Sequence, residues 1–227
     1  MAQPDPIPSM AIRDAATVIL VRDPATSPRV LMGQRGATAA FMPDKFVFPG
    51  GAVDAGDATV PLAAGPGEVC RARLAGETTG ATPDQLAAAA VRELWEETGQ
   101  CLGRPGEWSD APDDWSGFAE RGLVPDASPL SFFFRALTPP GRSRRFDARF
   151  FIADAAALAT DPDDFSRAED ELIHLSWVPL GEVRALNLPF ITRVVLAELA
   201  QHLPSTAAPA RVPFIRNDVI DGRVIWL

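Results

Sequence analysis

The segment from Arg92 to Gly99 places several carboxylates on one face of an expected helix. At 3.6 residues per turn, Glu93 lies one turn from Glu96 and Glu97. Like charges at that spacing repel one another and weaken an isolated helix by roughly 0.2–0.5 kcal/mol per pair. A cation would offset the repulsion, and carboxylate oxygens are ligands that Mg²⁺ and Mn²⁺ prefer. Taken alone, the segment also fits a solvated acidic helix without a ligand.

The residues before these carboxylates predict the helix that carries them. Thr82 is a good N-cap, Pro83 fits the first helical position, and Gln85 completes a capping box. Gly99 is a typical stop at the C-terminal end. The buried stripe expected on this helix consists of Leu86, Ala90, Val91 and Leu94. A helix from Pro83 that ends before Gly99 therefore presents the glutamates from its last turns.

A second element lies upstream, where an apolar run from Phe46 ends in Phe48-Pro49-Gly50-Gly51. This pattern predicts a strand that breaks into a tight loop, where the backbone comes close to another group. With both elements, the chain resembles the Nudix hydrolases. That family's motif runs Gly, five residues, Glu, seven residues, then Arg-Glu-apolar-x-Glu-Glu-x-Gly-apolar. Its second half matches Arg92 to Gly99, and its usual lead-in matches Phe48 to Gly51.

The chain departs from this motif in its first half. Counted back from the arginine, the first Glu of the motif falls on Asp84 and its Gly falls on Thr78. An insertion, about residues 55–80, therefore separates Gly51 from the helix. Gln100 stands where the family usually has an aliphatic residue. These departures leave the metal-binding carboxylates intact.

The resemblance implies a metal site for Mg²⁺ or Mn²⁺. Its ligands would be the carbonyl of Gly50 and the carboxylates of Glu93, Glu96 and Glu97, with Glu96 either a direct ligand or a water-mediated one. Arg92 would orient Glu96, although a surface ion pair of little energetic value is the alternative. Glu93 and Glu96 are both candidates for the general base.

Many members of the family take a further carboxylate from a loop before a Trp-containing strand. Three acids, residues 169–171, occupy that place ahead of Trp177. Glu171 is the candidate for a metal ligand or the base. Three solvated acids in a loop remain the alternative.

Apolar runs and turn signals outline the rest of the fold. Strands are expected at 16–22, 29–34, 46–48, 130–137, 146–153 and 172–178, a helix at 190–202, an exposed loop at 103–114, and a C-terminal hairpin at 219–224 with a turn at Asp221-Gly222. Strands on both sides of helices predict an α/β layered fold. The resemblance sharpens this to an α/β/α sandwich with a mixed sheet, and we expect a single domain over residues 1–227.

Composition narrows the class of protein. The net charge of −9 and a pI of about 4.7 argue against a nucleic-acid binder, which needs a basic face. No apolar run approaches the roughly 20 residues of a membrane span, and the N-terminus has no signal-peptide pattern. Cys70 and Cys101 are too few for a disulfide framework. We therefore expect a cytoplasmic protein; a homodimer is left open.

The expected substrate comes from a finer resemblance. Arg35, the element from Phe48 to Asp57, the long insertion and the segment from Arg145 to Phe151 are similar to the coenzyme A diphosphatase branch. Arg144 and Arg145, with Arg142, form a basic cluster that could contact a phosphate or could be a hairpin face in water. Arg35, Arg144 and Arg145 are thus the candidate substrate-binding residues.

The resemblance implies an enzyme that hydrolyses the diphosphate of coenzyme A or acyl-coenzyme A to 3′,5′-ADP and a 4′-phosphopantetheine product. ADP-ribose, NADH or a dinucleotide is the alternative substrate, and the absence of tyrosine argues against dinucleoside polyphosphates. A nucleotide-binding regulatory module without turnover is the alternative of another class. The intact acids of the motif favour catalysis.

Overall fold

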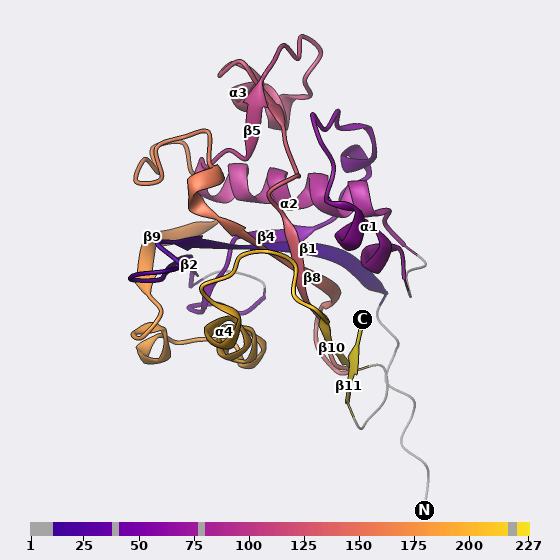
Figure 1. Ribbon diagram of the computed structural model, residues 1–227, viewed down its shortest axis with the longest axis vertical. Coiled ribbons are helices and arrows are strands. Elements are labelled where there is room, and N and C mark those ends of the chain that lie inside the picture. The colour runs from indigo at the N-terminus through magenta and orange to yellow at the C-terminus, as the bar shows by residue number, and fades with distance from the viewer. Residues whose placement is uncertain (1–10, 38–40, 77–79, 218–221) are drawn as a thin grey trace, which may run out of the picture.

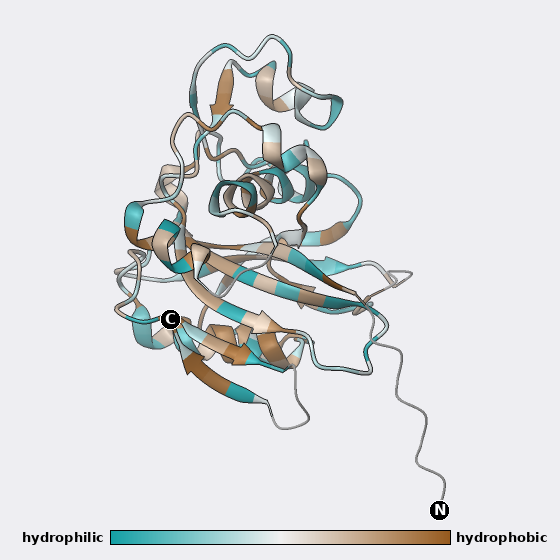
Figure 2. Cartoon of the chain, turned by 90° about the vertical axis from the view of Figure 1, so that its right-hand side faces the viewer, coloured by the Kyte–Doolittle hydropathy of each residue, from teal (hydrophilic) through white to brown (hydrophobic). Residues whose placement is uncertain are grey.

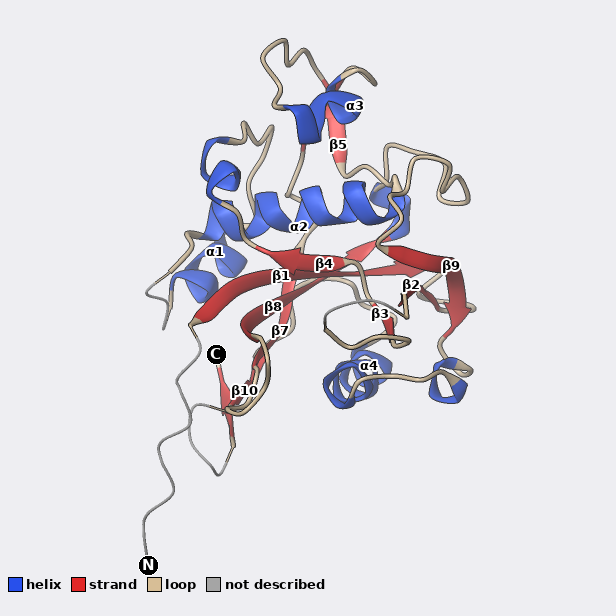
Figure 3. Cartoon of the chain, turned by 180° about the vertical axis from the view of Figure 1, so that it is seen from behind, coloured by secondary structure: helices blue, strands red, loops and turns tan. Residues whose placement is uncertain are grey.

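A mixed β-sheet with helices on both faces forms the centre of the molecule (Figures 1 and 3). This arrangement is seen in a computed structural model that describes residues 11–37, 41–76, 80–217 and 222–227. The predicted α/β/α sandwich with a mixed sheet is confirmed.

Within the described residues, nine strands form the main sheet in the order β11-β10-β7-β8-β1-β2-β3, with β4 on β1 and β9 on β2. The pairs β1–β8 and β7–β10 are parallel, whereas β1 runs antiparallel to β2 and to β4. Two further strands, β5 and β6, pair with each other. The strands are β1 (Ile12–Arg22), β2 (Arg29–Arg35), β3 (Phe46–Val47), β4 (Gly50–Ala52), β5 (Gly103–Pro105), β6 (Leu123–Pro125), β7 (Ser131–Leu137), β8 (Arg145–Asp154), β9 (Leu172–Pro179), β10 (Pro213–Arg216) and β11 (Arg223–Trp226).

Two long helices cover opposite faces of the sheet, as Figure 3 shows. Helix α2 packs its apolar side on one face, against Ala16, Val18 and Leu20 of β1. Helix α4 packs on the other face, against Ile19 and Val21 of the same strand. Figure 2 shows hydrophobic and hydrophilic segments in succession along the strands. The helices are α1 (Glu68–Ala75), α2 (Pro83–Thr98), α3 (Ser116–Ala119) and α4 (Phe190–His202), with 3-10 turns at η1 (Ala55–Thr59), η2 (Asp113–Trp115), η3 (Ala155–Ala157) and η4 (Val183–Ala185).

The predicted bounds of α2 are confirmed, together with its caps. The backbone N–H of Gln85 donates to Oγ1 of Thr82 over 3.2 Å, and the N–H of Thr82 donates back to Oε1 of Gln85 over 2.8 Å. Gly99 ends the helix with a φ of +72°, a conformation that glycine adopts without strain. The helix is therefore fixed at both ends, and its last two turns have a defined direction.

Other segments differ from expectation in ways that pairing explains. β1 starts at Ile12 rather than at residue 16, because Ile12 to Ala15 pair with β8. The predicted loop at 103–114 contains β5, whose partner β6 was not predicted. At the C-terminus, β10 pairs with β11 in an antiparallel hairpin, and Asp221 of the predicted turn lies outside the described residues. Within the described part of the chain, no helix has the length and apolar character that crossing a membrane requires.

Candidate active site

The Gly-Gly element and the end of helix α2 meet at the edge of β1. The backbone N–H of Gly50 donates to Oε2 of Glu97 over 2.7 Å. Gly50 lies opposite Thr17 of β1 and has a φ of +154°, which other residues rarely adopt. A Cβ at this position would stand 2.5 Å from the carbonyl oxygen of Ala16 and 2.6 Å from Cα of Thr17. Only glycine therefore allows the backbone to lie between β1 and the glutamate.

At Gly51 a Cβ would also clash, in this case with the side chain of Glu93. A Cβ on Gly51 would lie 2.6 Å from Cδ of Glu93, so that the carboxylate rests directly on the glycine backbone. Glu93 is 9% exposed and Glu97 only 2%. The two glycines thus form a cradle for two buried carboxylates from successive turns of α2.

The surroundings of Glu93 and Glu97 disfavour the ionised form of both carboxylates. Burial raises the pKa of Glu93 to about 7, although the neighbouring Arg92 acts in the opposite direction. Burial also raises the pKa of Glu97 well above its ordinary value, and the charges of Glu93 and Glu171 add to this effect. The bond from the N–H of Gly50 partly opposes it. A cation between the carboxylates would lower both pKa values, because it favours the ionised forms.

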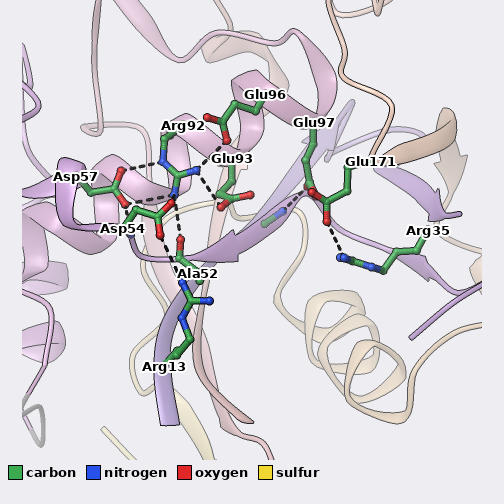
Figure 4. A network of polar contacts seen from close by, with 11 residues as sticks. Arg13, Arg35, Ala52, Asp54, Asp57, Arg92, Glu93, Glu96, Glu97 and Glu171 are labelled. Atoms are coloured by element: carbon green, nitrogen blue, oxygen red, sulfur yellow. Dashed lines mark hydrogen bonds and ion pairs between the residues drawn. The ribbon is translucent and has the colours of Figure 1, made fainter. Parts of the chain in front are cut away.

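Arg92 joins the helix to the loop that follows β4, as Figure 4 shows. Its Nη1 donates to Oε2 of Glu96 over 2.8 Å and lies 3.1 Å from Oε1 of Glu93. Its Nη2 donates to the carbonyl of Ala52 over 2.9 Å. Its Nε donates to Oδ1 of Asp57 over 2.9 Å. Burial alone would lower the pKa of Arg92, but these acids raise it, so the predicted pairing with Glu96 is part of a buried network and not a surface ion pair.

Asp57 is a site residue that the sequence reasoning missed. It is 3% exposed, and it accepts from Nε and Nη2 of Arg92 and from the backbone N–H of Asp54. Asp84, to which the counting assigned this place in the motif, instead forms an exposed ion pair with Arg71. Thr78 lies outside the described residues.

The signal for Asp57 was present in the sequence. Counted forward from Gly51, five residues lead to Asp57, as the first half of the motif requires. The insertion therefore begins after Asp57, and the two halves of the motif meet in space through Arg92.

Glu171 and Arg35 lie on the other side of the glutamates (Figure 4). Nη2 of Arg35 donates to Oε1 of Glu171 over 2.6 Å. The backbone N–H of Glu169 donates to the carbonyl of Glu96 over 2.8 Å, which fastens the acidic loop to helix α2. Glu171 thus stands close enough to raise the pKa values of both Glu93 and Glu97.

The candidate metal ligands fit a hard divalent cation by their chemistry. In the described part of the chain, no group of three His, Cys, Asp or Glu side chains is already arranged around one point. The carboxylates are instead held by protein donors: Glu97 by the N–H of Gly50, Glu93 by Arg92, and Glu171 by Arg35. A metal ion would have to replace some of these contacts. The ligand roles of Gly50, Glu93, Glu96 and Glu97 stay predictions.

The structure does not bring Arg144 and Arg145 to the carboxylates. Arg145 lies opposite Ile12 of β1, five residues from the position opposite Gly50, which is about 16 Å along a strand. Arg145 is buried and donates to the carbonyls of Thr138 and Asn217. Its guanidinium therefore connects the start of β8 to the backbone at Thr138 and Asn217.

Arg144 is exposed beside a surface depression. With Arg13 and Phe146, it lines a hollow of about 280 Å³. Arg13 also lines a second hollow of about 330 Å³, together with Asp54. Arg13 and Asp54 form an ion pair of 3.4 Å, and Asp54 is 3.8 Å from Arg92. Arg13 thus lines both hollows, one of which contains Asp54 beside Arg92 and the other Arg144.

The chain is similar to several known proteins. It shares 30% identity over 179 residues with "Putative nudix hydrolase 7" of Caenorhabditis elegans; the match covers 73% of this chain and 51% of that protein. The chain thus spans about half the length of the curated relative it matches. No protein-family model matches the chain.

Solved structures are also similar. The NUDIX hydrolase from Alicyclobacillus acidocaldarius is 28% identical with a TM-score of 0.65, over 88% of this chain and 99% of that one. The NUDIX domain of Shewanella oneidensis NrtR, complexed with ADP ribose, is 12% identical with a TM-score of 0.49, over 88% and 93% of the two chains.

Proposed function

We propose that the chain is a Nudix hydrolase, the family to which its similarities point, and that it hydrolyses the diphosphate linkage of a nucleoside diphosphate derivative with the help of Mg²⁺ or Mn²⁺. One observation carries this proposal: two buried carboxylates, Glu93 and Glu97, rest on the backbone of Gly50 and Gly51 and repel each other. Such an arrangement opposes folding unless a cation joins it, and diphosphate hydrolysis is chemistry in which bound cations neutralise developing charge and activate water.

Each residue of the site has a distinct proposed task. Glu93, Glu97 and the carbonyl of Gly50 would hold the metal, and Glu96 would be either a direct ligand or a water-mediated one. Arg92 fixes the carboxylate of Glu96 through a 2.8 Å contact and keeps it from turning away. These assignments come from the resemblance to the family, and the contacts of Glu97 with Gly50 and of Glu93 and Glu96 with Arg92 support them.

Three glutamates remain candidates for the general base. A pKa of about 7 would let Glu93 accept a proton near neutral pH, which suits this role. Glu171 is 54% exposed at its side chain and can reach an approaching water. Glu96 is the third candidate: burial raises its pKa, while the contact with Arg92 acts in the opposite direction.

For the substrate, we propose coenzyme A or an acyl-coenzyme A, cleaved to 3′,5′-ADP and a 4′-phosphopantetheine product. The support is the sequence resemblance at Arg35 and at Phe48 to Asp57, together with the hollow beside Arg13 and Arg144. A guanidinium can bind the 3′-phosphate, which ADP-ribose lacks. Because Arg145 donates to backbone carbonyls, the phosphate contact falls to Arg13 and Arg144.

The alternatives are ADP-ribose, NADH or a dinucleotide as substrate, and a regulatory module that binds a nucleotide without turnover. The complete acid set from Glu93 to Glu97 favours catalysis over the regulatory module. A cytoplasmic location, a homodimer and the lack of a nucleic-acid partner stay expectations from the sequence.

The proposal is tested by measuring Mg²⁺-dependent hydrolysis of coenzyme A, dephospho-coenzyme A, ADP-ribose, NADH and a diadenosine polyphosphate. We expect turnover that Glu97→Gln abolishes, and a preference for coenzyme A over its dephospho form of about tenfold, the value of one charge-assisted contact. The preference should shrink in Arg144→Ala but not in Arg142→Ala, since Arg142 is exposed outside the lining of the hollow.

Other outcomes would contradict the substrate assignment or the enzymatic activity separately. Equal efficiency on both forms, or a preference for ADP-ribose, contradicts the coenzyme A assignment and leaves the diphosphatase standing. Nucleotide binding without turnover of any substrate favours the regulatory module.

A further inference from the structure

Arg35 and Glu171 form an ion pair that bridges two strand ends beside the carboxylate cradle. Arg35 ends β2, and Glu171 directly precedes β9, whose first residue, Leu172, lies opposite Arg35. The pair joins Nη2 to Oε1 over 2.6 Å. The side chain of Arg35 is 19% exposed and that of Glu171 is 54% exposed. The arginine is therefore held in place, whereas the glutamate has room to move.

The contact uses only half of the binding edge of the guanidinium. Nε and Nη2 of an arginine point the same way and can grip two oxygens at once. Elsewhere in this protein that edge is filled: Arg92 uses both atoms on Asp57, and Arg135 uses both on Asp147. In Arg35, Nη2 bonds Glu171, while Nε is buried without a hydrogen-bond partner among the described residues.

A buried donor without an acceptor opposes folding, so such a donor in a native protein points to a further partner, which can be a water, an ion or a ligand. The missing acceptor must be an oxygen that reaches Nε beside Nη2. The charge of Arg35 acts on Glu97, so this edge lies within electrostatic reach of the cradle. A tetrahedral phosphate bound there would present two oxygens to the edge, and its diphosphate bridge would be near the candidate metal ligands.

We propose that Arg35 exchanges partners: a phosphate of the substrate takes both Nε and Nη2, and the displaced Glu171 turns to the metal held by Glu93 and Glu97. The inference rests on the proposed function, since it assumes a diphosphate substrate and a metal at that cradle. Before the exchange, Glu171 is neutralised by Arg35. After it, Glu171 faces two other carboxylates and needs the metal as a counter-charge. Substrate phosphate and metal therefore bind cooperatively, through one glutamate with two partners.

The exchange predicts that loss of Glu171 increases the affinity of the metal-free protein for a nucleoside diphosphate. Glu171 competes with the phosphate for Arg35, so Glu171→Gln should bind ADP in EDTA more tightly than the wild type, by about tenfold if one charge-assisted contact is freed. Loss of a metal ligand alone would not tighten ADP binding in EDTA, so the remaining alternative is a simple effect of the lost negative charge. Isothermal titration calorimetry with ADP measures the two affinities.

A cycle of variants separates exchange from simple removal of a negative charge. In the Arg35→Ala background, Glu171→Gln should no longer tighten ADP binding. Glu169→Gln is the matched control, since it removes an exposed charge from the same loop, and it should change ADP affinity less than twofold.

Mn²⁺ gives a second readout without ligand. Arg35→Ala releases Glu171 and should tighten Mn²⁺ binding, followed by electron paramagnetic resonance, by about tenfold. The double variant Arg35→Ala with Glu171→Gln should lose that gain. If the gain persists, Arg35 acts on the metal only through its charge and the exchange is wrong.

The outcomes also distinguish this inference from the function it rests on. Unchanged or weaker ADP binding by Glu171→Gln, in a protein that hydrolyses diphosphates, overturns the exchange alone. The expected changes in ADP and Mn²⁺ affinity, in a protein that turns over no diphosphate, overturn the enzymatic proposal and leave the exchange as a ligand-binding device.

Discussion

Replacing Glu93 by Gln measures how strongly the buried acids oppose folding when no metal is bound. The pKa of Glu93 is about 7, against an ordinary 4.5, because its carboxylate is buried. The values differ by about 2.5 pH units (7 − 4.5), and at about 1.36 kcal/mol per unit the ionised side chain lowers the free energy of unfolding by about 3 kcal/mol. Gln keeps the shape and cannot ionise.

The sign of the pH dependence follows from proton binding. Between pH 4.5 and pH 7 the folded state keeps a proton on Glu93 that the unfolded chain loses, so stability decreases as the pH rises through this window. We expect Glu93→Gln to match the wild type near pH 4.5 and to exceed it by about 3 kcal/mol at pH 8 in EDTA; this figure already includes the contact with Arg92, which lowers the pKa of Glu93.

Urea unfolding at several pH values, in EDTA and in Mn²⁺, makes this measurement. Saturating Mn²⁺ should reverse the order of the two proteins, because only the wild type has the charge that the metal needs. Glu169→Gln, an exposed acid of the nearby loop, is the control. A Gln variant that is less stable than the wild type at pH 8 in EDTA would refute the reasoning, since the ion pair with Arg92 would then outweigh the cost of burial.

Two further changes test the frame of the site. Asp57→Asn leaves its buried partner Arg92 undercompensated and should lower the free energy of unfolding by about 3 kcal/mol. Asp84→Asn, at an exposed ion pair, should lower it by no more than about 1 kcal/mol. Similar losses for the two variants in urea titrations would argue against a stabilising role of the Asp57–Arg92 contact. Gly51→Ala, which puts a Cβ 2.6 Å from Cδ of Glu93, should weaken Mn²⁺ binding about tenfold or more, while Gly56→Ala, where nothing lies within 4 Å, should leave it unchanged.

Local signals allowed the helix that carries the glutamates to be predicted to the residue. The capping box of Thr82 and Gln85, the proline at the first helical position and the left-handed Gly99 are each set by neighbours within a few positions. The same holds for α4 and for the centres of the strands. The ends of strands were harder, because the start of β1 is set by its partner β8, more than a hundred residues away.

The sequence-based prediction was wrong at the insertion that separates the two halves of the motif. Counting backward from Arg92 assumed a continuous motif, and it reached Asp84, which pairs with Arg71 on the surface. The count forward from Gly51 identifies Asp57 as a residue of the motif, but its contact with Arg92 depends on how the residues between them fold, which no short-range pattern encodes. The single contact between Arg35 and Glu171 likewise depends on the pairing of β2 with β9, which lie far apart in the sequence; the Nε of Arg35 is left without an acceptor among the described residues.

The buried pair of Asp57 and Arg92 has a consequence for how freely this chain can change length. These residues are 35 positions apart, whereas the motif of the family separates their counterparts by eight. Closing the longer loop costs about 1.3 kcal/mol more in chain entropy, since each doubling adds about 0.6 kcal/mol. A single charge-assisted hydrogen bond contributes about 1.5–3 kcal/mol, enough to offset that difference. Extra sequence can thus be accommodated here without moving the glutamates. Helix α1 lies in this extra sequence, and its Arg73 donates to the carbonyls of Pro209 and Ala210, which connects the inserted segment to a region near the C-terminus.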